Sequence, residues 1–286
     1  MRINPRHTEK FIFGSLFSVS FLIIIPISWV LLITLKYGLS VINIDFLTKS
    51  PTFNAGGGIY PAILGTILLV IGTIIFSLPI GLAAAIYLSE YSSKNLLTRF
   101  IRIGIISLAG VPSIVYGLFG FAFFVLFLGF DRSLLAGSLT LSLMILPVVI
   151  TTSREAIDTV PEHFREVSLS LGATKWQTIR YAVLPHALSG ILTGTILGVG
   201  RAAGETAPII FIASAWLINT PVSIIGRGGR FMALPNYLYS TYALVGKSME
   251  NPNTPYGIAL VLMLLVFIIT LPAIMIRAKL RKERKW

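Results

Sequence analysis

Residues 187–218 form a long apolar stretch that carries two charges, and they read ALSGILTGTILGVGRAAGETAPIIFIASAWLI. The stretch is longer than the roughly 20 helical residues that cross the hydrocarbon core of a bilayer. Its charged side chains are Arg201 and Glu205. An apolar stretch of this length predicts a membrane-spanning helix. Ionisable groups are costly in the hydrocarbon core, so we expect both side chains to face protein or a water-filled cavity rather than lipid.

Five more apolar stretches contain no Asp, Glu, Lys, Arg or His. They are residues 11–35, 61–88, 103–130, 134–152 and 256–276. The chain is 55% hydrophobic and 12% charged, against roughly 25% charged in soluble domains. This composition excludes a soluble enzyme, a disordered chain and a coiled coil, and long apolar runs exclude an outer-membrane barrel. We expect an all-α polytopic membrane protein with six transmembrane helices, forming a single domain over residues 1–286.

The distribution of basic residues predicts the orientation. Sixteen of the 23 Lys and Arg residues fall in residues 1–10, 89–102, 153–186 and 277–286. Six fall in residues 36–60, 131–133 and 219–255. Basic residues accumulate in cytoplasmic loops, so both termini are expected in the cytoplasm. The basic C-terminal tail suits an anionic lipid surface, and no nucleic-acid partner is expected.

The cytoplasmic loop 153–186 has the pattern of two short helices joined by a turn. Phe164, Val167 and Leu171 form an i, i+3, i+7 apolar stripe after Pro161. Gly172 then stands where a helix end needs a left-handed residue.

The second short helix is predicted from Thr174, which with Gln177 has the spacing of a capping box. We expect this helix to end at Leu184–Pro185, just before the fifth span. Spacing alone leaves two interpretations of the pair, an amphipathic hairpin lying on lipid or a knob that another protein grips.

Glycines recur at four-residue spacing in the fifth span. Gly190, Gly194 and Gly198 form one series, and Gly200 and Gly204 form a second pair. The positions expected to allow close helix packing are Gly190, Gly194, Gly198 and Gly204. Arg201 and Glu205 lie seven residues after two of these glycines, so both are expected on the same face.

Two roles compete for the charged pair. In one, Arg201 and Glu205 neutralise each other and hold helices in register. In the other, they line a solute path, since a guanidinium matches two oxygens of an oxyanion. A carboxylate accepts a hydrogen bond only from a solute that carries a proton, as phosphate does at neutral pH and sulfate does not. The pair is therefore a plausible filter for protonated phosphate.

The loop resembles the EAA loop of ABC importer permeases, whose pattern is E-A-A, three residues, G, nine residues and I-x-L-P. This chain keeps Glu166, Gly172, Leu184 and Pro185. It differs at Val167, Ser168 and Ala182. The resemblance implies a coupling helix that docks on a separate ATPase subunit. The residues expected to couple are Glu166, Ser168, Leu171, Gly172, Ala173 and Thr174.

The segment GRAAGETAP at residues 200–208 resembles the fifth-helix signature of phosphate ABC transporter permeases, the PstA/PstC family. Overall length and the loop text favour the PstA type. The resemblance implies a type I ABC importer permease (MetI-like) fold in a bacterial inner membrane. It also implies a substrate path through Arg201, Glu205 and the adjoining Thr206.

The same resemblance implies the partners of the chain. They are a second, PstC-like permease, a PstB-like ATPase dimer that holds ATP and Mg²⁺, and a periplasmic, PstS-like phosphate-binding protein. The chain itself is expected to bind no cofactor and no metal and to catalyse no reaction. Two alternatives remain open: a permease for another oxyanion such as molybdate or sulfate, and a secondary transporter using Arg201 and Glu205.

Overall fold

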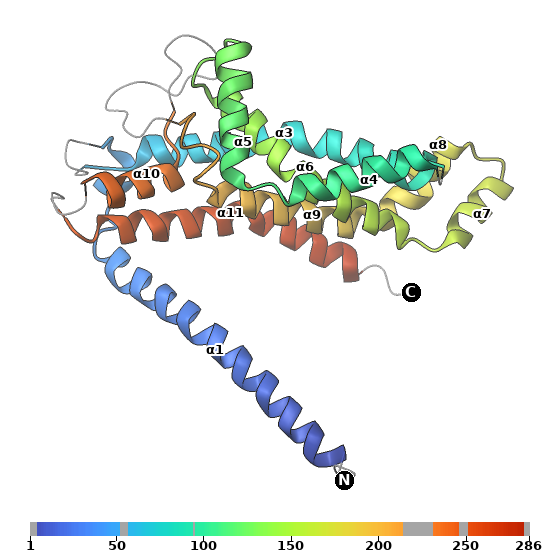
Figure 1. Ribbon diagram of the computed structural model, residues 1–286, viewed down its shortest axis with the longest axis horizontal. Helices are drawn as coiled ribbons and strands as arrows, with labels where there is room; N and C mark the ends of the chain where they lie inside the picture. The colour runs from blue at the N-terminus through green and yellow to red at the C-terminus, as the bar shows by residue number, and fades with distance from the viewer. Residues whose placement is uncertain (1–4, 52–56, 94, 214–230, 246–250, 283–286) are drawn as a thin grey trace.

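The computed structural model describes residues 5–51, 57–93, 95–213, 231–245 and 251–282 (Figure 1). Helices dominate these ranges, and the described residues form no β-strand. The helices are α1 (Pro5–Leu39), α2 (Ile44–Thr48), α3 (Tyr60–Ile86), α4 (Leu96–Ala109), α5 (Ser113–Gly120), α6 (Leu134–Asp158), α7 (Glu162–Ser170), α8 (Lys175–Gln177), α9 (Leu184–Gly204), α10 (Leu234–Ser240) and α11 (Thr254–Lys282). Four π-helical turns join or extend them: η2 (Tyr87–Tyr91), η3 (Phe121–Phe127), η4 (Thr178–Val183) and η5 (Thr241–Val245).

Within the described residues, five helices are long and apolar enough to cross a membrane. They include α1, α3 with η2, α6, the helix from Lys175 to Gly204, and α11. A sixth span exists if the bent pair of α4 and α5 with η3 counts as one. The predicted all-α polytopic fold is therefore confirmed.

The predicted third span, residues 103–130, is not one straight helix. Its two halves, Leu96–Ala109 and Ser113–Phe127, meet at an angle of 99°, and Figure 1 shows α5 standing across the other helices. Pro112 sits at the break with an extended ψ of 138°. Proline has no N–H and disfavours helical backbone at Val111 before it, which explains why the helix stops there.

The core is built around α6, which is the most deeply buried of the span candidates. It packs against both α3 and α9, which also contact each other. Small residues allow the close approach. A Cβ on Gly72 of α3 would collide with Ser138 of α6, and Ser142 of α6 donates a hydrogen bond to the Thr73 carbonyl of α3 at 3.0 Å. Helix association in a bilayer depends on such packing and interhelical hydrogen bonds.

The helix pair predicted within residues 153–186 is confirmed, but its second member is longer than predicted. Gly172 has a φ of +82° between α7 and α8, and both hydrogen bonds of the Thr174 capping box are present. The helix does not end at Leu184–Pro185; it continues through η4 into α9. The Leu184 N–H bonds the Ile179 carbonyl across the wider π turn. Pro185 has no N–H to donate to the preceding turn, and the π turn of η4 directly before it is where the continuous helix accommodates the proline.

The predicted fifth span, 187–218, is too long at its C-terminal side. Helix α9 ends at Gly204, and Glu205 has an extended backbone with φ −76° and ψ 127°. Glycine and the nearby Pro208 both oppose helix continuation. Residues 205–213 are irregular, and residues 214–218 lie outside the described residues.

Helix α1 leaves the bundle at an angle (Figure 1). Its C-terminal end packs on the start of α11, where a Cβ on Gly38 would lie 2.8 Å from the Tyr256 carbonyl oxygen. Most of its side chains from Ile12 onward are exposed in this single chain. An apolar helix of this kind requires lipid or another membrane subunit around it.

Candidate functional site

Arg201 and Glu205 meet where α9 ends. Arg201 is in the last helical turn and Glu205 is the residue that follows the helix. The Arg201 Nε donates a hydrogen bond to the Glu205 Oε1 at 3.1 Å. Their side chains are 37% and 18% exposed. The contact between the two groups agrees with the hypothesis that they neutralise each other. The guanidinium also stays partly exposed, as the solute-path hypothesis requires.

The two charges are not carried on one continuous helix, as the sequence analysis assumed. The extended backbone of Glu205 still returns its carboxylate to Arg201, so the pair forms across the helix end. A cation in the last turn also interacts favourably with the negative end of the helix dipole. Thr206 lies in the turn that follows, where its carbonyl accepts hydrogen bonds from the N–H groups of Ile209 and Ile210 at 3.2 and 3.1 Å.

Helix α5 supports this turn from the other side. A Cβ on Gly117 would lie 2.7 Å from the Pro208 carbonyl oxygen. Nothing larger than glycine fits at this position without movement. The broken third span therefore holds the segment that carries Glu205 and Thr206, a link that the sequence did not reveal.

The glycines of α9 differ in what they face. Added Cβ atoms on Gly190 and Gly194 would collide with Ala156 and Thr152 of α6. At Gly198 the nearest atom, in Ile145, would be 3.4 Å away. Gly204 has no atom within 4 Å of an added Cβ, so in this chain it ends the helix rather than packing against another one.

The predicted coupling residues lie together at one end of the molecule, on α7 and in the turn between α7 and α8 (Figure 1). The exposed members of this set are Glu166, Leu171, Gly172 and Thr174. Leu171 is 83% exposed, and α7 contains no buried residue. An exposed apolar tip on a small folded projection is typical of a protein-docking surface.

Ser168 and Ala173 stabilise this projection internally and do not form its exposed tip. The Ser168 and Thr178 hydroxyls are 3.0 Å apart, which links α7 to the following helix. The Ala173 N–H donates to the Ser168 carbonyl at 3.2 Å. We call residues 162–183, the two helical arms and the Gly172 turn, the elbow.

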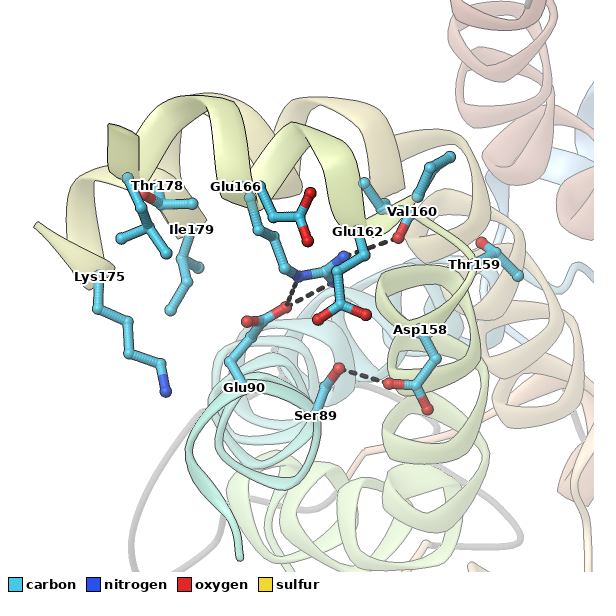
Figure 2. Close-up of a pocket in the computed structure, with 13 residues that line it drawn as sticks. Ser89, Glu90, Asp158, Thr159, Val160, Glu162, Glu166, Lys175, Thr178 and Ile179 are labelled. Atoms are coloured by element: carbon cyan, nitrogen blue, oxygen red, sulfur yellow. Dashed lines mark hydrogen bonds and ion pairs between the residues drawn. The ribbon is translucent and has the colours of Figure 1, made fainter. Parts of the chain in front are cut away.

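A cavity of about 730 Å³ lies inside the elbow, beside the end of α3. Figure 2 shows Glu90, Asp158, Glu162 and Glu166 around it. Two of its lining residues form an ion pair, in which the Arg165 Nη2 is 2.7 Å from the Glu90 Oε1. The sequence does not reveal this pair, because its members are 75 residues apart and neither lies in an unusual pattern.

The structure is that of a helical membrane protein with a projecting helix pair at one end. Residues 77–282 match the family described as binding-protein-dependent transport system inner membrane component. The chain belongs to this family, whose members are membrane subunits of ABC transporters and do not hydrolyse ATP; a separate subunit does.

Named relatives agree with this membership. The chain is 33% identical to the phosphate transport system permease protein PstA 1 of Mycobacterium tuberculosis, over 98% of this chain and 91% of that protein. It is 34% identical to PstA of Mycobacterium leprae, over 87% and 82%. It is 36% identical to YqgI of Bacillus subtilis, named as an ABC transporter permease, over 64% of this chain and 62% of that protein.

Solved structures share the fold. A bacterial ABC transporter that imports alginate superposes with a TM-score of 0.65 and 14% identity, covering 95% of this chain and 96% of that chain. The MetNI methionine ABC transporter in an inward-facing conformation gives a TM-score of 0.60 and 18% identity, covering 78% and 94%. The expected type I importer (MetI-like) permease fold is therefore confirmed.

Proposed function

We propose that this chain is the PstA-type membrane permease of an ATP-driven importer that moves inorganic phosphate into a bacterial cell. The observation that carries the proposal is the 33% sequence identity, over 98% of this chain, to a permease named for phosphate transport. The Arg201–Glu205 pair at the end of α9 supplies chemistry that suits the same substrate.

The proposed assembly has four kinds of subunit. This chain pairs with a second, PstC-like permease, which covers apolar side chains of α1 that are exposed in the single chain. A PstB-like ATPase dimer binds the elbow and holds ATP and Mg²⁺, while this chain binds no cofactor. A PstS-like periplasmic protein delivers phosphate. Both termini face the cytoplasm, because 16 of the 23 Lys and Arg residues lie in segments that this orientation puts on the inside.

Selectivity follows from the two charges. The Arg201 guanidinium donates to phosphate oxygens, and charge-assisted bonds of this type are roughly twice as strong as neutral ones. The Glu205 carboxylate accepts a hydrogen bond from the P–OH group of protonated phosphate. Sulfate has no proton to offer, so its oxygens would face the carboxylate without a hydrogen bond. The existing Arg201–Glu205 contact must open or be shared when the anion arrives.

Coupling follows from the elbow. ATP-dependent closure of the ATPase displaces α7 and α8, and the continuous helix from Lys175 to Gly204 carries that displacement to the charged pair. The ATPase states must therefore contact the elbow differently, since a partner shifts an equilibrium only through differential binding.

The test is uptake by the four-component complex in sealed vesicles. We expect radiolabelled phosphate to enter only with ATP and binding protein, and excess sulfate or molybdate to compete weakly. Uptake that proceeds on an ion gradient without ATP would favour the secondary transporter. Preferential uptake of another oxyanion would overturn the phosphate assignment while leaving the family intact.

A further inference from the structure

The end of α3 is tied to the elbow by a shielded ion pair. Arg165 of α7 donates from Nε and Nη2 to the Glu90 Oε1 of η2 at 3.0 and 2.7 Å. The side chains are 19% and 9% exposed. Removal from water strengthens the attraction between such charges, so this contact resists separation more than a surface ion pair does.

Arg165 also closes the turn that precedes its own helix. Its Nη1 donates to the Val160 carbonyl at 2.7 Å and its Nη2 to the Ile157 carbonyl at 3.1 Å. The arginine therefore joins three pieces: the end of α6, the start of α7 and the end of α3. Any displacement of α7 acts directly on Glu90.

The neighbours of Glu90 bind two other parts of the same region. Ser89 donates a hydrogen bond to Asp158 at the end of α6, as Figure 2 shows. Tyr91 lies under the ammonium group of Lys175, whose Nζ is 4.9 Å from the ring centroid. Lys175 begins the second arm of the elbow, and a cation over an aromatic face at this distance is attractive.

Three consecutive residues can reach three elements because successive side chains on a helix point in different directions. The π-helical geometry of η2, which closes with the Ser92 N–H bonded to the Tyr87 carbonyl at 2.8 Å, widens this helix end. Single π turns of this kind recur at functional positions in helices. Ser89, Glu90 and Tyr91 are here called the η2 clamp.

We propose that the residues of the η2 clamp are positioning residues: they make α3 move with the elbow when the ATPase changes state. The proposal rests on the proposed function only in requiring an ATPase partner. Without the clamp, the elbow would drive α9 alone through its continuous helix. With it, α3 and α9, which both pack against α6 and also contact each other, are displaced together.

Spin-label distances in the assembled importer test this role. The chain has no cysteine, so introduced cysteines at the exposed Ile75 of α3 and Ile268 of α11 give defined labels when the other subunits lack reactive cysteines. We expect the distance between the two labels to differ between ADP and trapped ATP. In Glu90→Gln, we expect at least half of that change to be lost.

The variant is chosen to keep the fold. Glutamine retains an oxygen that Arg165 can donate to, and Arg165 keeps its two carbonyl acceptors. Glu90→Asp, which keeps the charge, should restore most of the change. The control is Asp45→Asn, which breaks an exposed ion pair with Lys49 in the extracellular segment and should leave the change intact.

Three results would overturn the clamp: no nucleotide-dependent change in the wild type, a full change in Glu90→Gln, or equal loss in Glu90→Gln and Glu90→Asp. If Glu90→Gln loses the ATPase on purification, Tyr91→Leu takes its place, and a full change there also overturns the proposal. Because the readout is driven by nucleotide, it holds whichever anion is carried; phosphate uptake, measured separately, tests the proposed function.

Discussion

The Arg201 guanidinium is the group on which the proposed selectivity depends. Its Nε is bonded to Glu205, and more than a third of its side chain is exposed in the single chain. A planar fork binds two oxygens at once, which a lysine ammonium cannot do. The distinction between arginine and lysine therefore separates a binding role from a simple balance of charge.

Arg201→Lys keeps the charge and loses the fork. We expect phosphate uptake to fall by roughly tenfold or more, since one charged hydrogen bond contributes about 1.5–3 kcal/mol and about 1.4 kcal/mol corresponds to a factor of ten. The measurement is initial uptake rate at saturating ATP, with co-purification of the ATPase as the check on assembly. Arg99→Lys, at an exposed arginine of α4, is the matched control. Wild-type uptake in Arg201→Lys would mean that Arg201 does not bind the anion and only holds the helices in register.

Glu205→Gln tests the carboxylate as a detector of the phosphate proton. The amide adds a donor that a fully deprotonated anion can bond, so discrimination against sulfate should weaken. We expect the ratio of sulfate to phosphate concentrations giving equal inhibition of uptake to fall by roughly tenfold, the equivalent of one hydrogen bond of about 1.4 kcal/mol. An unchanged ratio would show that the carboxylate does not select the anion.

At the level of elements, the elbow depends on one backbone conformation. Gly172 has a φ of +82° and open space where a side chain would begin. A substitution there meets no steric clash, and its cost is conformational. Left-handed backbone costs ordinary residues roughly 1–2 kcal/mol and is least tolerable for β-branched ones.

Gly172→Val should therefore distort the elbow without damaging the membrane core. We expect the ATPase to lose most of its stimulation by the loaded binding protein, while the spans remain folded by circular dichroism. Gly172→Asn is the matched control, because asparagine tolerates left-handed backbone; it should retain most of the stimulation. Equal stimulation in both variants would mean that the turn conformation does not matter for coupling.

Spans and short helices could be predicted from sequence because their signals are local. Apolar length identifies α6 and α11, and the Thr174–Gln177 spacing identifies a cap that both hydrogen bonds confirm. The 99° bend at Pro112 could not be predicted, since a proline can kink, break or merely begin a helix according to its neighbours. The Glu90–Arg165 pair depends on tertiary packing between residues 75 apart, and no local pattern records it.

At the scale of the whole molecule, sidedness connects the two proposed sites. The elbow lies at the end where α3 finishes and α11 reaches Lys282, while α10 and the start of α11 lie at the other end (Figure 1). Helix α9 ends between these two ends (Figure 1), and the charged pair lies at that end of α9. An importer needs this order, with the ATPase contact on the cytoplasmic side and the substrate entrance on the other.

Cysteine labelling tests that order directly, because the chain has no cysteine of its own. Leu171→Cys places a thiol on the exposed tip of the elbow and Leu39→Cys places one at the far end of α1, where the side chain is 62% exposed. In intact cells, a membrane-impermeant maleimide should label Leu39→Cys and spare Leu171→Cys; inverted vesicles should give the opposite result. The two positions control for each other, since both are exposed leucines at helix ends. Labelling of Leu171→Cys from outside would place the elbow away from any cytoplasmic ATPase, and the coupling mechanism would fail even though the family membership stands.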